Sequence, residues 1–594
     1  MTTSGVGAVV DLPGLSVIVR GLEFWQGGGT LVSEPRLLEQ VQRSLPGAGV
    51  TQLRAAPSDP GSSDDPYTRI GVPVTTFPRW LRCPACHQVW PIDGTDQFAL
   101  HHRWGRRPDL AKWTHTQCGK QSVAPSRRRP CIPARFVVVC ENGHLDEFPY
   151  AAFVHAGSTK TCGGAKLEMR DAGSTLGPRV LITCLACDTR RNISDASGTK
   201  GAHNLPRCRG RHPHLQTFSA CDAPLKLMVL GASNLWFSVS ASALHLPQEE
   251  PVLGLLNDHW EVLSAQPTPV VLAAVVAAIP ELAMLRDRSA KELWALVEAE
   301  KARRSDAADP PAVEPTDLLD EEWSLLCHPT TTDHDGDFLA EPTPIPADYT
   351  GLLEQVVQVK RLREVQALLG FTRVEGPAPA EIAPARIVRL SAPGRSSWVP
   401  AVERRGEGLF LQLREELVAE WVTRVAEHPH ITALHGAHER WLVNRDLAPR
   451  PDFPLPRYLL LHTLSHLLLR QVALECGYSS ASIRERLYVG TTASPTAGIL
   501  LSTAASDTEG TLGGLVALGQ ASFLGRLLEE ALADASTCSS DPLCGERLPS
   551  SPSDVLHAAA CHACLFASET SCESGNRFLH RGVLVDIVPG LTLL

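Results

Sequence analysis

The spacing of apolar positions changes along the chain and predicts a β-rich beginning followed by a helical middle. Near the beginning, β-prone runs at 135–140 and 179–184 predict short strands, and residues 225–240 predict a strand that leaves this region. Residues 251–304 have a helical pattern. Residues 351–369 have apolar side chains at mixed three- and four-residue spacing, which predicts an amphipathic helix.

The last third of the chain alternates between helical and extended patterns. These patterns predict helices at 408–427, 457–476 and 519–534, strands at 498–503 and 583–588, and a glycine-rich turn at 508–514. Helices and strands therefore occur together here, in contrast to the β-rich beginning.

A chain of 594 residues is too long for a single hydrophobic core. We therefore expect an α+β, multidomain fold. Residues 1–240 would form the β-rich region, and 401–594 an α/β C-terminal domain. The helical region between them, 241–400, contains acidic and proline-rich linkers, of which 306–322 carries seven acidic residues and three prolines.

The composition is that of an ordinary globular protein, with 43% hydrophobic residues and a formal net charge of −10. This charge excludes a protein-wide cationic field, so nucleic acid would need a local basic surface. The first 20 residues lack a signal-peptide pattern, and the most apolar run, 270–279, is too short to cross a bilayer. We expect a cytoplasmic protein without membrane contact, where clustered cysteines indicate metal binding or catalysis more often than disulfides.

Fifteen of the seventeen cysteines lie in two islands, ten at 83–221 and five at 538–572. Three Cys-x-x-Cys knuckles occur in them, at Cys83/Cys86, Cys184/Cys187 and Cys561/Cys564. A knuckle supplies two thiolates to a tetrahedral zinc ion, and a second pair must come from elsewhere. The alternative is a set of reduced, buried cysteines, which we prefer only for the isolated Cys327 and Cys476.

Sequence proximity suggests how the remaining cysteines complete these sites. The nearest partners of the first knuckle are Cys118 and Cys131, and those of the second are Cys208 and Cys221. Cys140, His144 and Cys162 remain, and they could form a third N-terminal site or exchange places with ligands of the first site. For the last knuckle we expect Cys544 and Cys572, with Cys538 as the competing ligand. The sequence thus predicts zinc-ribbon-like sites holding two or three zinc ions, or more.

Two segments of the first island are strongly basic. Their candidate phosphate-binding side chains are Arg103, Arg106, Arg107, Lys112, Arg127, Arg128, Arg129, Arg190, Arg191, Arg207, Arg209 and Arg211. Cations neutralise phosphates, and tryptophans nearby could stack on bases. A solvated face or a contact with an acidic protein explains such runs equally well.

Sequence motifs for a motor or a common catalytic site are missing. There is no P-loop, no G-x-S-x-G elbow and no kinase motif set. His462 and His466 share one helical face, but Thr463 stands where a zincin has its general base, so we interpret this pair as structural or interfacial. Asp507 and Glu509 lie in the glycine-rich turn, where backbone freedom explains the pattern better than catalysis.

Several stretches resemble the DrmB proteins of the DISARM anti-phage systems. They are RFVVVCENGHLDEFPY at 135–150, GASNLW at 231–236, HTLSHLL at 462–468, CGYSS at 476–480, DTEGTLGGL at 507–515 and CHACLFASETSCE at 561–573, followed by Asn576. The C-terminal stretches also resemble the zinc-binding domain of unknown function found in MrfA-type DNA-repair helicases, and Cys544, Cys561, Cys564 and Cys572 match that family's zinc-ligand pattern.

The resemblance implies a partner of a DrmA-like helicase that helps to engage invading DNA, with residues 401–594 as a helicase-associated zinc-binding domain. We therefore expect a non-catalytic, zinc-binding subunit without a catalytic residue of its own. One alternative is a metal-dependent nuclease or hydrolase that uses His462, His466, Asp507 or Glu509. Another is a stand-alone zinc-containing DNA-binding regulator.

Overall fold

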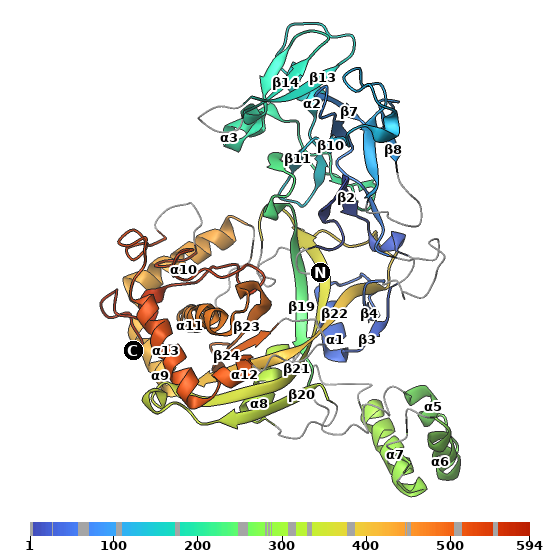
Figure 1. The fold of residues 1–594 in the computed structure, drawn as a ribbon. Helices are drawn as coiled ribbons and strands as arrows, with labels where there is room; N and C mark the ends of the chain where they lie inside the picture. Colours follow the sequence, from blue (N-terminus) through green and yellow to red (C-terminus); the bar gives the residue numbers. More distant parts are fainter. Residues whose placement is uncertain are drawn as a thin grey trace.

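A long antiparallel sheet forms the centre of the molecule in the computed structural model (Figure 1). The model describes all residues except 1–3, 26–27, 58–70, 102–109, 173–178, 247–258, 280–281, 283–284, 287, 307–316, 330–335, 377–385, 446, 448–452, 504–513 and 550–555. The strand order is β19 (Phe237–Leu244), β21 (Leu353–Thr372), β22 (Trp398–Leu413), β24 (Pro495–Thr503) and β23 (Ile483–Gly490), and β20 (Phe338–Thr343) pairs with β21. This sheet contains strands from both sides of residues 240 and 400, where we expected the domain boundaries.

Strand β21 replaces the helix that we predicted at 351–369, so that prediction is wrong. All residues at 365–372 are buried, because both faces of the strand are covered. A strand of this kind lacks the apolar–polar alternation that identifies a half-buried strand. The same reason applies to 408–427, whose first part belongs to β22 and whose second part forms α9 (Glu415–Val425). The expectation of a helical middle is therefore correct only in part.

The N-terminal lobe consists of short strands, which confirms its predicted β-rich character. One sheet has the order β10 (Ile132–Pro133), β6 (Trp80–Arg82), β7 (Gln88–Pro91), β13 (Leu167–Ala172), β14 (Arg179–Cys184) and β15 (Arg190–Asn192). A smaller sheet joins β12 (Leu145–Glu147), β11 (Phe136–Val139) and β18 (Lys226–Val229), and a hairpin pairs β8 (Phe98–His101) with β9 (Lys112–His115). The turns between these short strands carry most of the cysteines.

Further N-terminal segments connect this lobe to the central sheet. Strands β1 (Val9–Leu12), β2 (Leu15–Val19) and β5 (Val74–Thr76) form a three-stranded sheet. By contrast, β4 (Gln52–Arg54) pairs with β22, and β3 (Leu31–Val32) pairs with β4. Helix α1 (Pro35–Ser44) packs against β19 and β21 through Leu37 and Val41. Residues 31–54 thus pack against the middle of the chain.

Three helices of the middle segment form a separate cluster, away from the central sheet in Figure 1. Helices α5 (Trp260–Ser264), α6 (Pro269–Ala278) and α7 (Ala290–Asp306) enclose their own core, which includes Leu263, Leu272 and Val297. The helical pattern at 251–304 is confirmed for the described part of that range. By contrast, α8 (Leu318–Cys327) packs on the central sheet through Glu322.

The C-terminal part is built around helix α11 (Leu455–Cys476), which is buried along most of its length and confirms the predicted helix there. It packs against β23, β24 and α13 (Ala521–Ala535), with α10 (Pro429–Val443) and α12 (Gly514–Leu518) beside it (Figure 1). The helix ends at Gly477, whose φ of 67° favours glycine. None of the described helices is long and apolar enough to cross a membrane.

The strand predicted at 583–588 is wrong. The chain there forms a short 3-10 helix, Arg581–Val583, followed by turns. Val583, Leu584 and Val588 are apolar because they fill the C-terminal core, not because they join a sheet. The strand predicted at 498–503 and the helix predicted at 519–534 are confirmed by β24 and α13.

Candidate metal centres

Histidine, cysteine and glutamate side chains of the described residues converge in five groups. In each group the donor atoms lie within 4.8 Å of one another. We call them the first, second and third N-terminal groups, the four-cysteine group and the His-Glu-Cys group. Each contains four side chains, the number that a structural zinc ion requires.

The first N-terminal group contains Cys83, Cys86, His115 and Cys118. The Sγ atoms of Cys83 and Cys118 are 3.7 Å apart, and Sγ of Cys86 is 3.4 Å from Nδ1 of His115. The other ring nitrogen of His115, Nε2, donates to the side-chain oxygen of Gln97 at 3.2 Å. That hydrogen bond leaves Nδ1 of His115 unprotonated, as a metal ligand must be.

Cys131, which we expected as the fourth ligand, is buried next to this group but is not one of its four converging side chains. Its thiol donates a hydrogen bond to Cys83 and thereby holds the pKa of Cys83 well below its usual value, although burial opposes this shift. His115 takes the position expected for Cys131. Its spacing to Cys118 equals that of a knuckle, and this is the signal that sequence reasoning missed.

The second N-terminal group contains Cys140, His144, Cys208 and Cys221. Nδ1 of His144 lies 3.2 Å from Sγ of Cys140, and Nε2 lies 2.8 Å from the Ser219 hydroxyl. The turn between Cys140 and His144 requires glycine at position 143, where φ is 76° and a Cβ would lie 2.1 Å from the side chain of Val388.

The third N-terminal group contains His155, Cys162, Cys184 and Cys187. Nε2 of His155 lies 3.3 Å from Sγ of Cys187, while its Nδ1 donates to the backbone carbonyl of Ala151 at 2.7 Å. Burial opposes ionisation of Cys184, but backbone N–H groups at the knuckle outweigh it and lower its pKa to about 6. His155 was not among the predicted ligands.

These groupings differ from those suggested by proximity in sequence. Cys208 and Cys221 join Cys140 and His144 instead of Cys184 and Cys187, because β11 pairs with β18 and brings their flanking loops together. Cys162 reaches Cys184 because β13 and β14 form a hairpin. Strand pairing decides both partnerships, and cysteine spacing alone does not contain that information.

The four-cysteine group contains Cys538, Cys544, Cys561 and Cys564. The Sγ–Sγ distance is 3.5 Å between Cys538 and Cys561 and 3.7 Å between Cys544 and Cys564. Cys538, which we expected only as a competing ligand, thus occupies the fourth position. Cys572 lies instead in the His-Glu-Cys group, with His462, His466 and Glu485. Cys327 and Cys476 lie outside all five groups of the described residues.

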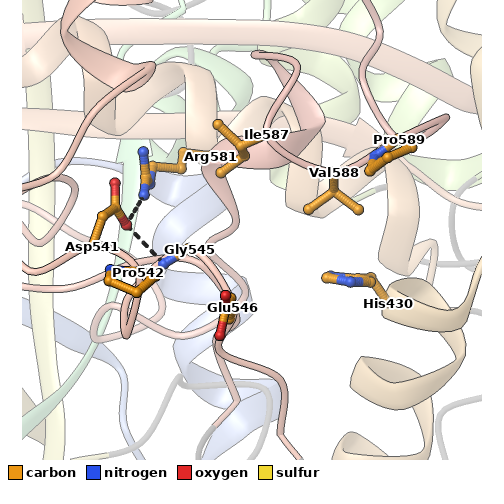
Figure 2. Close-up of a pocket in the computed structure, with 9 residues that line it drawn as sticks. All are labelled: His430, Asp541, Pro542, Gly545, Glu546, Arg581, Ile587, Val588 and Pro589. Atoms are coloured by element: carbon orange, nitrogen blue, oxygen red, sulfur yellow. Dashed lines mark hydrogen bonds and ion pairs between the residues drawn. The ribbon is translucent and has the colours of Figure 1, made fainter.

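An ion pair holds the loop that carries Cys538 and Cys544. Asp541 accepts hydrogen bonds from the backbone N–H groups of Cys538 and Gly545, at 2.8 and 2.9 Å, and pairs with the buried Arg581. Figure 2 shows this pair at one side of a cavity of about 500 Å³. Asp541 and Arg581 are bound to each other and to the loop, so they serve to position the cysteines.

Several of the predicted phosphate-binding side chains are engaged within the protein. Arg209 and Arg211 form ion pairs with Asp146, at 2.7 and 2.8 Å. Arg128 donates to the carbonyls of His115 and Thr116. Arg190 pairs with the Asp188 carboxylate, and Arg191 donates to the Phe153 carbonyl and to the side chain of Asn204. These arginines stabilise the metal-carrying loops.

Four of the other predicted cations are not engaged in this way. Among the described residues, Lys112, Arg127, Arg129 and Arg207 make no side-chain hydrogen bond or ion pair, and all except the half-buried Lys112 are exposed. The remaining predicted cations, Arg103, Arg106 and Arg107, lie outside the described residues, as do Asp507 and Glu509.

Comparison with known proteins decides the family. The chain is 32% identical over 473 residues to the DISARM protein DrmB of Bacillus paralicheniformis, an alignment that covers 78% of this chain and 82% of that protein. The chain belongs to the DrmB family. Within it, residues 1–237 match a domain of unknown function (DUF8724), and residues 464–565 match the MrfA Zn-binding domain.

The match to the MrfA Zn-binding domain includes every member of the four-cysteine group, which makes this DrmB-family chain a protein with a zinc-binding domain. A crystal structure of the DUF1998 helicase MrfA bound to DNA shares 10% sequence identity and a TM-score of 0.18, covering 36% of this chain and 22% of that one. That likeness is too slight to support a conclusion about the fold.

Proposed function

We propose that this chain is a non-catalytic, zinc-organised subunit of a DISARM-type anti-phage complex, in which it partners a DrmA-like helicase and helps to engage invading DNA. The observation that carries the proposal is the DrmB similarity across most of the chain, together with the zinc-binding domain within it. The sequence has no P-loop, which agrees with a motor supplied by another polypeptide.

The metal groups support a structural role. The strands of the N-terminal lobe are two to six residues long, too short to stabilise a lobe of this size by pairing alone. Each group joins residues from separate loops, so one ion would hold several of these strands together. A structural zinc ion contributes about 10–16 kcal/mol to the folding of small modules.

Burial argues against catalysis at the histidine pair. His462 and His466 are both 0% exposed and have Glu485 and Cys572 as neighbours. A catalytic metal needs an open position that substrate can reach, and no polymer could reach this group without unfolding the domain. The nuclease alternative therefore receives no support from these two residues.

The N-terminal lobe offers a small surface suited to DNA. Arg128 donates to the carbonyls of His115 and Thr116, at 2.6 Å for His115, and so fixes the segment next to β9. Arg127 and Arg129 flank it and are exposed, and Lys112 lies at the start of β9. Cations supported by a rigid lobe can bind phosphates without sequence selectivity.

Co-purification tests the proposal. A tagged form of this chain, co-expressed with the DrmA-like helicase of the same defence system, should recover a stable complex. The complex should hydrolyse ATP, and this chain alone should not. Failure to form the complex, or ATP hydrolysis by the isolated chain, would contradict the proposal. DNA cleavage by the isolated chain would favour the nuclease alternative instead.

A further inference from the structure

The His-Glu-Cys group lies deep in the C-terminal part, separate from the four-cysteine group. His462 and His466 are one turn apart on α11, Glu485 is on β23, and Cys572 is on the loop that follows the last knuckle. All four are buried. The match to the MrfA Zn-binding domain spans 464–565 and therefore leaves out both His462 and Cys572.

The distances within the group fit one small ion. Nε2 of His462 lies 3.1 Å from Sγ of Cys572 and 3.1 Å from Oε1 of Glu485, and Nε2 of His466 lies 3.5 Å from that same oxygen. For zinc bonds of about 2.0–2.3 Å, the corners of a tetrahedron lie about 3.3–3.8 Å apart. The separation of 3.5 Å falls within this range, and the two of 3.1 Å are only slightly shorter.

Hydrogen bonds outside the group fix which nitrogen of each histidine faces inward. Nδ1 of His462 lies 3.3 Å from the carbonyl of Phe578, and Nδ1 of His466 lies 2.9 Å from that of Leu565. A carbonyl oxygen can only accept, so each Nδ1 carries a proton. In the neutral ring, Nε2 then presents its lone pair to the centre of the group, as in metal-bound histidines.

The acidic members are oriented in the same way. Oε2 of Glu485 accepts from the Ser465 hydroxyl at 2.6 Å, while Oε1 accepts the backbone N–H of Glu573 at 3.1 Å and faces both histidines. Sγ of Cys572 accepts the backbone N–H of Asn576 at 3.1 Å. Nε2 of His466 is fully buried and has no hydrogen-bond partner in the described structure. A buried lone pair without a donor is costly, and a cation at the centre would satisfy it.

We propose that His462, His466, Glu485 and Cys572 bind a zinc ion at a second site of the C-terminal domain. Two imidazoles, a thiolate and a carboxylate form a donor set that suits zinc. Four protein ligands, all of them buried, make the site closed, so its role is structural. The ion ties α11 to β23 and to the loop that also carries Cys561 and Cys564, so two ions hold one loop from opposite ends. This inference does not depend on the helicase partnership.

The proposal predicts that the zinc losses caused by removing the two C-terminal sites add up, and this can be tested on the full chain. Zinc per folded chain is measured by native mass spectrometry for Cys572→Ala, Cys538→Ala and the double variant, with Cys476→Ala as a control on the same helix. We expect each single variant to lose one ion, the double variant two and the control none. Unchanged zinc in Cys572→Ala, or a loss of only one ion in the double variant, would overturn the proposal.

A second measurement needs no variant to fold. Anomalous diffraction at the zinc edge from crystals of the unaltered chain should give a peak between Nε2 of His462 and Sγ of Cys572, as well as one at the four-cysteine group. A peak at the four-cysteine group without one at the His-Glu-Cys group would overturn the proposal, because the buried group would then be a network of protonated histidines and anions.

Discussion

At the scale of single residues, the central sheet contains a buried carboxylate that several elements share. Glu322 is 0% exposed, lies on α8, and accepts from the guanidinium of Arg486 at 2.6 and 2.8 Å. It also accepts from the hydroxyl of Tyr488 at 3.1 Å and the backbone N–H of Leu244 at 2.9 Å. One side chain therefore links α8 with β19 and β23.

Removal of this carboxylate should strongly destabilise the fold. Glu322→Ala leaves the buried Arg486 guanidinium without its carboxylate partner, and such a loss typically costs about 3–5 kcal/mol. Urea unfolding measures the loss. Glu298→Ala, which breaks the exposed pair of Glu298 with Lys301 on α7, is the matched control and should cost less than about 1 kcal/mol. Equal losses in the two variants would contradict this account of Glu322.

At the scale of elements, the predictable segments are those whose own pattern decides their structure. Helices α11 and α13 are long and apolar at helical spacing, so they were found with nearly correct ends. Strand β21 was predicted as a helix instead, because its pairing with β22 and its burial on both faces decide its structure.

The same distinction holds for the candidate sites. All three knuckles bring their two thiols together locally, and each lies in one of the five groups. The partnerships of Cys140 with Cys208 and Cys221, and of Cys162 with Cys184, depend on strand pairing. His115 and His155 are brought in from a strand and a helix end. The proximity of Glu485 to Cys572, which is 87 positions later in the chain, can be seen only in the three-dimensional structure.

Deletion of the separate helical cluster should leave the rest of the fold intact. A variant that lacks 259–306, with its ends joined by a glycine–serine linker, loses α5, α6 and α7, which pack around their own core. We expect unchanged zinc content and an unchanged melting temperature for the remainder. Deletion of 317–329 is the contrasting control, because it removes α8 and Glu322 and should lower the melting temperature. A similar loss in both deletions would contradict the separation.

At the scale of the whole molecule, the N-terminal lobe lies beyond one end of the long strands of the central sheet, and the helices of the zinc-binding C-terminal part lie beside that sheet (Figure 1). We proposed that the lobe contacts DNA through Lys112, Arg127 and Arg129. This arrangement would let one end meet DNA while the other remains available to the helicase.

Charge reversal tests the DNA surface. Replacing Lys112, Arg127 and Arg129 with glutamate should weaken binding of the complex to DNA of any sequence and reduce the slope of log affinity against log salt by about 1 for each lost phosphate contact. The control is Arg190→Glu, because Arg190 already pairs with Asp188. Unchanged affinity and slope in the triple variant would remove this surface from the proposal.

The most direct test of the whole account is the zinc content of the full-length chain, purified without added metal and shown to be folded. The three N-terminal groups and the four-cysteine group predict at least four zinc ions per chain, and the His-Glu-Cys group predicts a fifth. A chelator that removes them should unfold the N-terminal lobe, as followed by circular dichroism. A folded chain that contains no zinc would contradict the account.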